Sequence, residues 1–204
     1  MAIIKFNNRR NSKCSKRINK LNRGIRYITD HKKTVSYLIG GTGVDENTAY
    51  ERMKTVKQFY GKEGGREYIH FCVSFKGKRD EELVSFIAEN ISVIFADFQV
   101  LFAVHTNTPN THIHFIINSV NVNNGRKFSQ SRTDLQRLKD IINEISNKFG
   151  LELEEMTVDE DDDYLFEYED YYEENLIEPM IFMDPEPEKQ ALIEAMIFYD
   201  ELLP

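Results

Sequence analysis

The sequence predicts an α+β fold, in which a central antiparallel β-sheet is flanked by helices and followed by an acidic C-terminal segment. Strand-like segments rich in β-branched and aromatic residues alternate with amphipathic helical patterns through the first 150 residues. Two of these segments, 98–105 and 111–118, are joined by a short loop, which favours antiparallel pairing. The charge of the chain changes sign near residue 150, and this change sets the acidic segment apart.

The first part of the chain is expected to contain one strand and two helices. Residues 2–6 are apolar enough for an edge strand, and apolar residues recur at helical spacing from about 15 to 28. A second helix is expected from about 46 to 59. The glycine-containing pieces 40–43 and 62–65 are interpreted as the loops on either side of it, and neither has the spacing of a nucleotide-binding P-loop.

The next part of the chain supplies three further strands and two further helices. Residues 67–75, 98–105 and 111–118 are rich in the residue types that favour strands. Apolar residues at helical spacing predict helices over 81–95 and from about 133 to 149. The pattern as a whole predicts one sheet with helices packed on it.

The charge is divided unequally between two parts of the chain. Residues 1–150 contain 25 Lys and Arg against 14 Asp and Glu, whereas residues 151–204 contain 1 against 20. We therefore expect a folded domain over 1–150 and an acidic, partly helical segment over 151–204. A basic domain suits a polyphosphate partner. A well-solvated surface accounts for the charge equally well when the charge is considered alone.

The remaining composition places the chain in a reducing compartment. The two cysteines, Cys14 and Cys72, lack the spacing of a disulfide framework or a metal knuckle. The N-terminus lacks the apolar stretch of a signal peptide, and no segment is apolar enough to span a membrane. A soluble, cytoplasmic protein is the expectation.

Three of the five histidines fall within the ten residues 105–114. Alternate side chains of a strand share a face, so His112 and His114 are expected to point the same way, and His105 ends the preceding strand. Three neutral imidazoles converging from two strands suit a metal site with open coordination positions. A polar sheet face is the alternative interpretation of the same alternation.

Three segments resemble the motifs of a known family. Segment 105–120 (HTNTPNTHIHFIINSV) resembles the third motif of the relaxase and mobilisation-nuclease family, which belongs to the HUH endonucleases. Segment 68–76 (YIHFCVSFK) resembles the second motif, and segment 24–34 (GIRYITDHKKT) resembles the first. The motifs occur in the family's order, and the resemblance covers about residues 1–150.

The resemblance implies a role for individual residues. It makes Tyr27 the nucleophile, makes His105, His112 and His114 the ligands of Mg²⁺ or Mn²⁺, and makes Ser74 a DNA-contacting residue. The family commonly has an acidic residue at the position of Asn107, where it would orient a histidine from the second coordination shell. An amide can accept one hydrogen bond there but supplies no negative charge.

The same resemblance implies a reaction. Attack of a tyrosine on a DNA phosphodiester leaves a 5′-phosphotyrosine and a free 3′-hydroxyl, and a bound cation neutralises the phosphoryl oxygens. Ligand chemistry alone suits zinc, manganese, cobalt or nickel better than magnesium. The expected protein is a relaxase that nicks single-stranded DNA at an origin of transfer of a plasmid or other mobile element, with other relaxosome proteins as partners.

Basic residues near these motifs are candidates for binding DNA. Four of them bracket Tyr27: Arg23, Arg26, Lys32 and Lys33. Arg126 and Lys127 follow the last strand and resemble a loop that meets the phosphate backbone, although a solvated basic turn is equally compatible. His31 and His70 are not assigned to the metal: His31 is a candidate for contacting DNA, and His70 is interpreted as a packed residue.

Two alternative functions remain open. A rolling-circle replication initiator would place its nucleophile after the histidines, and Tyr164 and Tyr168 have helical spacing there, but surrounding carboxylates disfavour phosphate. A non-catalytic DNA-binding accessory protein, restrained by its acidic segment, is the second. Covalent linkage to DNA separates both enzymes from the accessory protein, and the position of the linked tyrosine separates the enzymes from each other.

Overall fold

The computed structural model describes residues 5–6, 20–151 and 153. Their order along the chain is β1 (Lys5–Phe6), α1 (Lys20–Ile28), a short 3-10 helix (Ser36–Leu38), β2 (Ile39–Thr42), α2 (Ala49–Phe59), β3 (Tyr68–Ser74), α3 (Glu81–Val93), β4 (Val100–His105), β5 (His112–Asn118) and α4 (Arg132–Lys148). Of the predicted strand at 2–6, only residues 5 and 6 are described, as β1. Residues 2–4, the predicted start of the first helix and the acidic segment beyond residue 153 lie outside the described residues.

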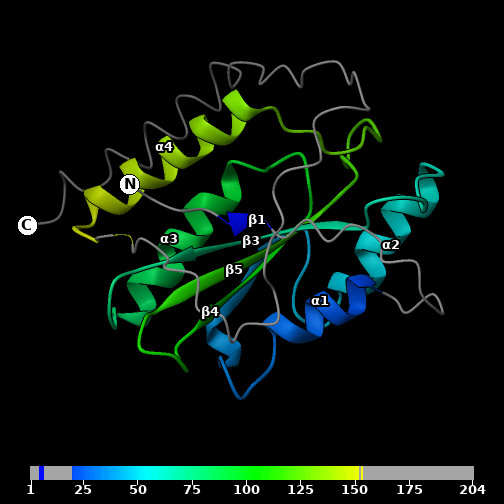
Figure 1. Cartoon of the computed structure of the whole chain (residues 1–204). Helices are drawn as coiled ribbons and strands as arrows, with labels where there is room; N and C mark the ends of the chain where they lie inside the picture. The colour runs from blue at the N-terminus through cyan, green and yellow to red at the C-terminus, as the bar shows by residue number, and fades with distance from the viewer. Residues whose placement is uncertain (1–4, 7–19, 152, 154–204) are drawn as a thin grey trace, which may run out of the picture.

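The strands form one antiparallel sheet in the order β1-β3-β5-β4-β2 (Figure 1). The longest strands, β3 and β5, lie at its centre and pair along their whole length. The α+β class and the central antiparallel sheet predicted from the sequence are confirmed. No helix among the described residues is both long and apolar enough to cross a membrane.

The two faces of the sheet are covered by different helices, as Figure 1 shows. Helices α3 and α4 cover one face, where aromatic and aliphatic residues such as Phe71, Phe102 and Phe115 form the larger core. Helices α1 and α2 cover the other, where the smaller core includes Leu101, Ala103 and Ile116. Because strand residues alternate between faces, these three residues share their face with the histidines of β4 and β5.

Helix α4 begins with a capping box that explains where it starts. The side chain of Ser131 accepts a hydrogen bond from the backbone N–H of Asp134, and the carboxylate of Asp134 accepts one from the backbone N–H of Ser131. The chain continues to pack beyond the helix, because Leu151 is buried in the larger core and Leu153 forms a bridge with Phe75.

The prediction of a loop at residues 40–43 is wrong for most of this segment. Residues 40–42 belong to β2, and only Gly43, with a φ of 73°, forms a turn. A Cβ atom on Gly40 would collide with the ring of Phe102, and one on Gly41 with the carbonyl oxygen of Val100. The glycines are therefore required by close packing of an edge strand and not by a loop.

Candidate active site

The three clustered histidines lie at one end of the sheet, on the face covered by α1. His105 ends β4 and pairs in register with His112, which begins β5, and His114 lies two residues further along β5. One ring nitrogen from each histidine lies within 4.8 Å of one from each of the others. The centroids of the rings of His105 and His114 are 4.5 Å apart. The structure thus brings together the three residues that the sequence selects as ligands.

Hydrogen bonds determine which nitrogen of each ring is available. Nε2 of His105 donates to the carbonyl oxygen of Ile28 at 2.8 Å, since a carbonyl can only accept. Nδ1 of His112 lies 3.2 Å from the carbonyl oxygen of Asn110 and 3.3 Å from the hydroxyl of Thr108. Donation to Ile28 leaves the lone pair of His105 on its Nδ1, and a hydrogen on Nδ1 of His112 toward the Asn110 carbonyl leaves the lone pair of that ring on Nε2.

Of the three histidines, His114 gives the clearest indication of a metal site. Its Nδ1 lies 3.0 Å from Nε2 of His70, and its Nε2 is buried without a hydrogen-bond partner among the described residues. A buried polar atom without a partner is unfavourable, and a bound cation is one way to satisfy it. The donor set of three imidazoles with one such orphaned nitrogen fits a divalent transition-metal ion.

Burial favours the neutral form of His70, His105 and His114. It lowers the pKa of His105 to about 4, with a smaller opposing effect from the Ile28 carbonyl and smaller reinforcing effects from Lys33 and two neighbouring histidines. Burial likewise lowers the pKa of His70 to about 4 and that of His114 well below its usual value. A neutral imidazole has the lone pair that a metal requires, so burial favours the form of His105 and His114 that can bind an ion near neutral pH.

Tyr27 lies in the last turn of α1, directly beside the cluster. The centroid of its ring is 5.5 Å from that of His114, in an edge-on arrangement, and 6.2 Å from that of His105. Three buried residues of α1 anchor the helix on the sheet: Leu21, Ile25 and Ile28. The amphipathic pattern of the helix therefore fixes the position of the tyrosine.

A cation lies directly against this tyrosine. Nζ of Lys33 is 3.6 Å from the centroid of the Tyr27 ring, within the range of a cation–π contact. The backbone N–H of Thr106, next to His105, donates to the carbonyl oxygen of Lys33 at 3.1 Å. The loop that carries Lys33 is thus attached to the strand that carries the first histidine.

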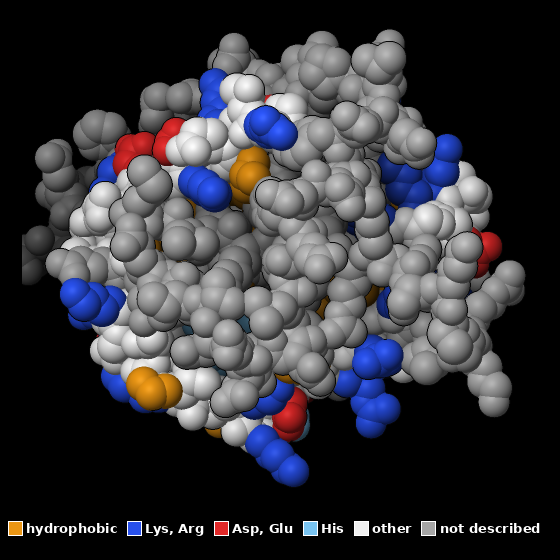
Figure 2. Space-filling view, in the orientation of Figure 1, with side chains coloured by type: hydrophobic (Ala, Val, Ile, Leu, Met, Phe, Trp, Pro, Cys, Tyr) orange, Lys and Arg blue, Asp and Glu red, His pale blue; other side chains and the backbone are white. Residues whose placement is uncertain are grey.

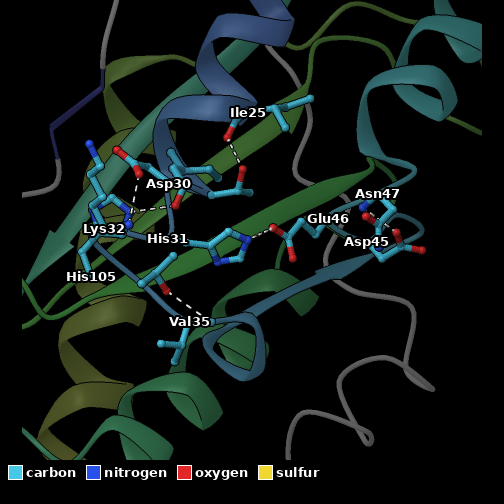
Figure 3. Close-up of polar contacts among 12 residues, drawn as sticks. Ile25, Asp30, His31, Lys32, Val35, Asp45, Glu46, Asn47 and His105 are labelled. Atoms are coloured by element: carbon cyan, nitrogen blue, oxygen red, sulfur yellow. Dashed lines mark hydrogen bonds and ion pairs between the residues drawn. The ribbon is translucent and has the colours of Figure 1, made fainter.

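Figure 3 shows the remainder of that loop. The side chain of Asp30 accepts a hydrogen bond from the backbone N–H of Lys32. His31 points toward Glu46, with 3.1 Å between Nε2 and the carboxylate. His31, a candidate for contacting DNA, is exposed and lies outside the metal cluster.

Some of the other predicted DNA contacts lie near the cluster. Ser74 pairs in register with His112 and shares its face of the sheet. Arg23, Arg26 and Lys32 are exposed on α1 and the loop after it. Lys and Arg side chains lie around the face that Figure 2 shows, with few Asp and Glu side chains among them.

Arg126 and Lys127 are not brought to this site. Lys127 forms a bridge with Val120, beyond the end of β5 that is opposite the histidines. The seven residues of β5 separate its ends by ~20 Å at ~3.4 Å per residue. The ammonium of Lys127 also donates to the carbonyl oxygens of Gly64 and Arg66 and to the hydroxyl of Ser119. These three bonds use all three hydrogens of the ammonium.

The hydrogen-bond partners of the three histidines include groups that the sequence does not suggest. Asn107 is exposed in the loop between β4 and β5. The contacts to the three rings include two carbonyl oxygens, the Thr108 hydroxyl and His70. A backbone carbonyl leaves no signal in the sequence, and His70 could be found only if the register of β3 against β5 were known.

Comparisons with known proteins agree with this geometry. The chain is similar to two proteins of Staphylococcus aureus, each named Protein rlx. The first is 28% identical over 138 residues, which cover 65% of this chain and 41% of that protein, and the second is 27% identical over 113 residues, which cover 54% and 34%. The chain thus spans less than half the length of either relative.

No solved structure matches the chain. The profile of the relaxase nuclease domain of MobA/VirD2-like type matches residues 27–151, a range that begins at Tyr27 and contains the whole histidine cluster. Because that range is more than half of the chain, the protein belongs to the MobA/VirD2-like relaxase nuclease-domain family.

Proposed function

We propose that this protein is a metal-dependent transesterase that nicks single-stranded DNA at an origin of transfer and remains linked to it through Tyr27. The observation that carries the proposal is the contact of the Tyr27 ring with His105 and His114 of the histidine cluster, with the Lys33 ammonium against the same ring. Membership of the relaxase family supports the same reaction.

Each group has a distinct part in the proposed step. His105, His112 and His114 would hold Mg²⁺ or Mn²⁺, which supplies positive charge to the phosphoryl oxygens when bound. The Tyr27 hydroxyl oxygen attacks the phosphorus and loses its proton, and the bond from phosphorus to the 3′ oxygen breaks. The 3′ oxygen leaves as a hydroxyl after taking up a proton, and the 5′ phosphate stays on the tyrosine.

Lys33 is suited to assist this step electrostatically. A positive charge beside the phenol ring favours the negative charge that develops as the hydroxyl loses its proton. The exposed cations Arg23, Arg26 and Lys32 would bind the phosphates on either side of the reacting one. We propose the same contact for Ser74, whereas Arg126 and Lys127 would meet DNA only at the far end of the sheet.

The proposed setting follows from this activity. The substrate is single-stranded DNA of a plasmid or other mobile element, in the cytoplasm, with other relaxosome proteins as partners. The test is to incubate the protein with single-stranded oligonucleotides of candidate origins and Mn²⁺, and to look for an adduct that survives denaturation. Mapping the adduct to Tyr27 supports the proposal, and mapping it to Tyr164 or Tyr168, which lie outside the described residues, contradicts it.

A further inference from the structure

His70 lies in the middle of β3, on the same face of the sheet as the metal cluster but outside the set of three ligands. In the register of β3 against β5, His70 is opposite Ile116 and Cys72 is opposite His114, so His70 and His114 are diagonal neighbours. Nε2 of His70 and Nδ1 of His114 are 3.0 Å apart, and the ring centroids are 5.1 Å apart. Both side chains are buried, with 8% of each residue exposed.

A hydrogen bond between two neutral imidazoles requires that one nitrogen carries the hydrogen and the other the lone pair. If His70 donated, Nε2 of His114 would carry a hydrogen, and that buried N–H would have no acceptor among the described residues. His114 would then have no lone pair for an ion. If His114 donates from Nδ1, its Nε2 has the lone pair, and a cation can satisfy it.

We propose that His70 is a positioning residue, which accepts the Nδ1 hydrogen of His114 and so holds Nε2 of His114 ready to bind the metal ion. This inference rests on the proposed function, because it assumes that His114 is a ligand. A ligating histidine usually donates its second nitrogen to a carboxylate, a carbonyl or water, and here an imidazole takes that place.

The choice of a neutral acceptor has an electrostatic consequence. His105 donates to a carbonyl, the turn around His112 offers a carbonyl and a hydroxyl, and His114 faces an imidazole. None of these contacts brings a negative charge to the cluster. As far as these contacts go, a bound cation would keep its charge for the phosphate oxygens of DNA, which a carboxylate in their place would repel.

The experiment begins with the full chain free of metal. Long-range ¹H–¹⁵N correlation spectra distinguish the two tautomers of a histidine, and a His114→Gln spectrum assigns the signals of His114. We expect His114 to carry its hydrogen on Nδ1. A wild-type His114 with its hydrogen on Nε2 overturns the inference, and this measurement needs no substitution at position 70.

Variants then test the effect on metal binding, measured by calorimetry with Mn²⁺ and the full chain. His70→Leu removes the acceptor, and we expect it to lower the affinity about 10- to 100-fold and to shift His114 away from the Nδ1–H tautomer. His70→Gln keeps an acceptor oxygen and should restore part of the Mn²⁺ affinity and part of the Nδ1–H tautomer of His114. Cys72→Ala, on the same face of the same strand, is the matched control and should change neither.

The outcomes separate this inference from the proposed function. A wild-type chain that binds no Mn²⁺ overturns the proposed function and the positioning role with it. A wild-type chain that binds Mn²⁺, and binds it equally tightly after His70→Leu, overturns the positioning role alone.

Discussion

At the scale of the residue, the proposed site combines three candidate metal ligands on the sheet with a candidate nucleophile from another element. Each of the three histidines has one ring nitrogen engaged by a neutral partner, so the rings are oriented before any ion arrives. The ring of Tyr27 meets that of His114 edge-on and has the Lys33 ammonium beside it. Such preorganisation reduces the cost of reaching the reactive geometry.

Removing the ligands should remove the metal. We expect His112→Ala and His114→Ala each to weaken Mn²⁺ binding by at least about 10-fold and to abolish nicking, because each deletes one of three donors. Calorimetry and an oligonucleotide nicking assay give the two measurements. His31→Ala, which changes an exposed histidine outside the cluster, serves as the control. Undiminished metal binding by a variant that carries both His112→Ala and His114→Ala would show that the two histidines are structural.

Removing one hydroxyl should remove the covalent product. We expect Tyr27→Phe to abolish the denaturation-resistant adduct, while the free energy of unfolding changes by less than about 1 kcal/mol and DNA affinity stays near that of the wild type. Tyr50→Phe is the matched control, since Tyr50 packs against the same smaller core. An adduct formed by Tyr27→Phe at the wild-type rate would rule out this nucleophile.

The cluster of three histidines could be predicted from the sequence because it depends on a local rule. Alternation along one strand places His112 and His114 on the same face, and a short loop returns His105 to them. The position of Tyr27 against the cluster was available only through the family resemblance, because it depends on how α1 docks. The partnership of His70 with His114 depends on a cross-strand register, which no local pattern specifies.

At the scale of the element, β2 shows how packing can override the usual preference of glycine for loops. Gly40 and Gly41 lie against the side chain of Phe102 and the backbone of Val100. The sequence favours a loop here because glycine is depleted in strands. The close approach of β4 to β2, which requires glycine at these positions, is visible only in the assembled sheet. The helices α3 and α4 were predicted well, since their apolar residues recur at helical spacing.

A substitution in β2 tests this explanation. We expect Gly41→Ala to lower the free energy of unfolding by about 1–3 kcal/mol, because its Cβ would collide with backbone atoms that cannot move aside easily. Denaturant unfolding gives the measurement. Gly64→Ala is the control, since a Cβ there meets nothing within 4 Å. Equal stability of the two variants would mean that β2 can shift away from β4.

At the scale of the whole molecule, the buried histidines link stability to pH. In the unfolded chain a histidine titrates near its ordinary pKa of 6.5, whereas burial lowers the pKa of His70 and of His105 to about 4 in the folded protein. Between these values the unfolded chain binds protons that the folded chain does not. The stability that each histidine contributes is therefore complete above pH 6.5 and is lost as the pH falls toward 4.

Unfolding curves without divalent metal should show this dependence. We expect the free energy of unfolding to fall between pH 6.5 and 5 by up to ~1.4 kcal/mol per pH unit for each of these histidines. His70→Gln should flatten the slope, and His31→Gln, at an exposed position, should leave it unchanged. A stability that is constant from pH 6.5 to 5 would contradict the burial of these rings.

The division of charge along the chain leads to a further hypothesis about the acidic segment, whose residues beyond 153 lie outside those that the structure describes. If this segment competes with DNA for the basic domain, its removal should raise DNA affinity on the order of 10-fold at low salt and steepen the salt dependence. Truncation after Leu153 preserves the contacts of Leu151 and Leu153. Equal affinities of the full and truncated chains across a salt series would exclude autoinhibition.

The hairpin formed by β4 and β5 supplies all three ligands from residues 105–114, whereas Tyr27 reaches them only through the packing of α1 on the sheet. The candidate metal ligands are thus neighbours along the chain, and the candidate nucleophile joins them through a long-range contact. A chain in which α1 has detached while the sheet persists would have no tyrosine to react, and its His105 ring would lose the hydrogen bond to the Ile28 carbonyl oxygen. Local opening of α1 would therefore stop the proposed nicking reversibly while the three candidate ligands stay beside one another on the sheet.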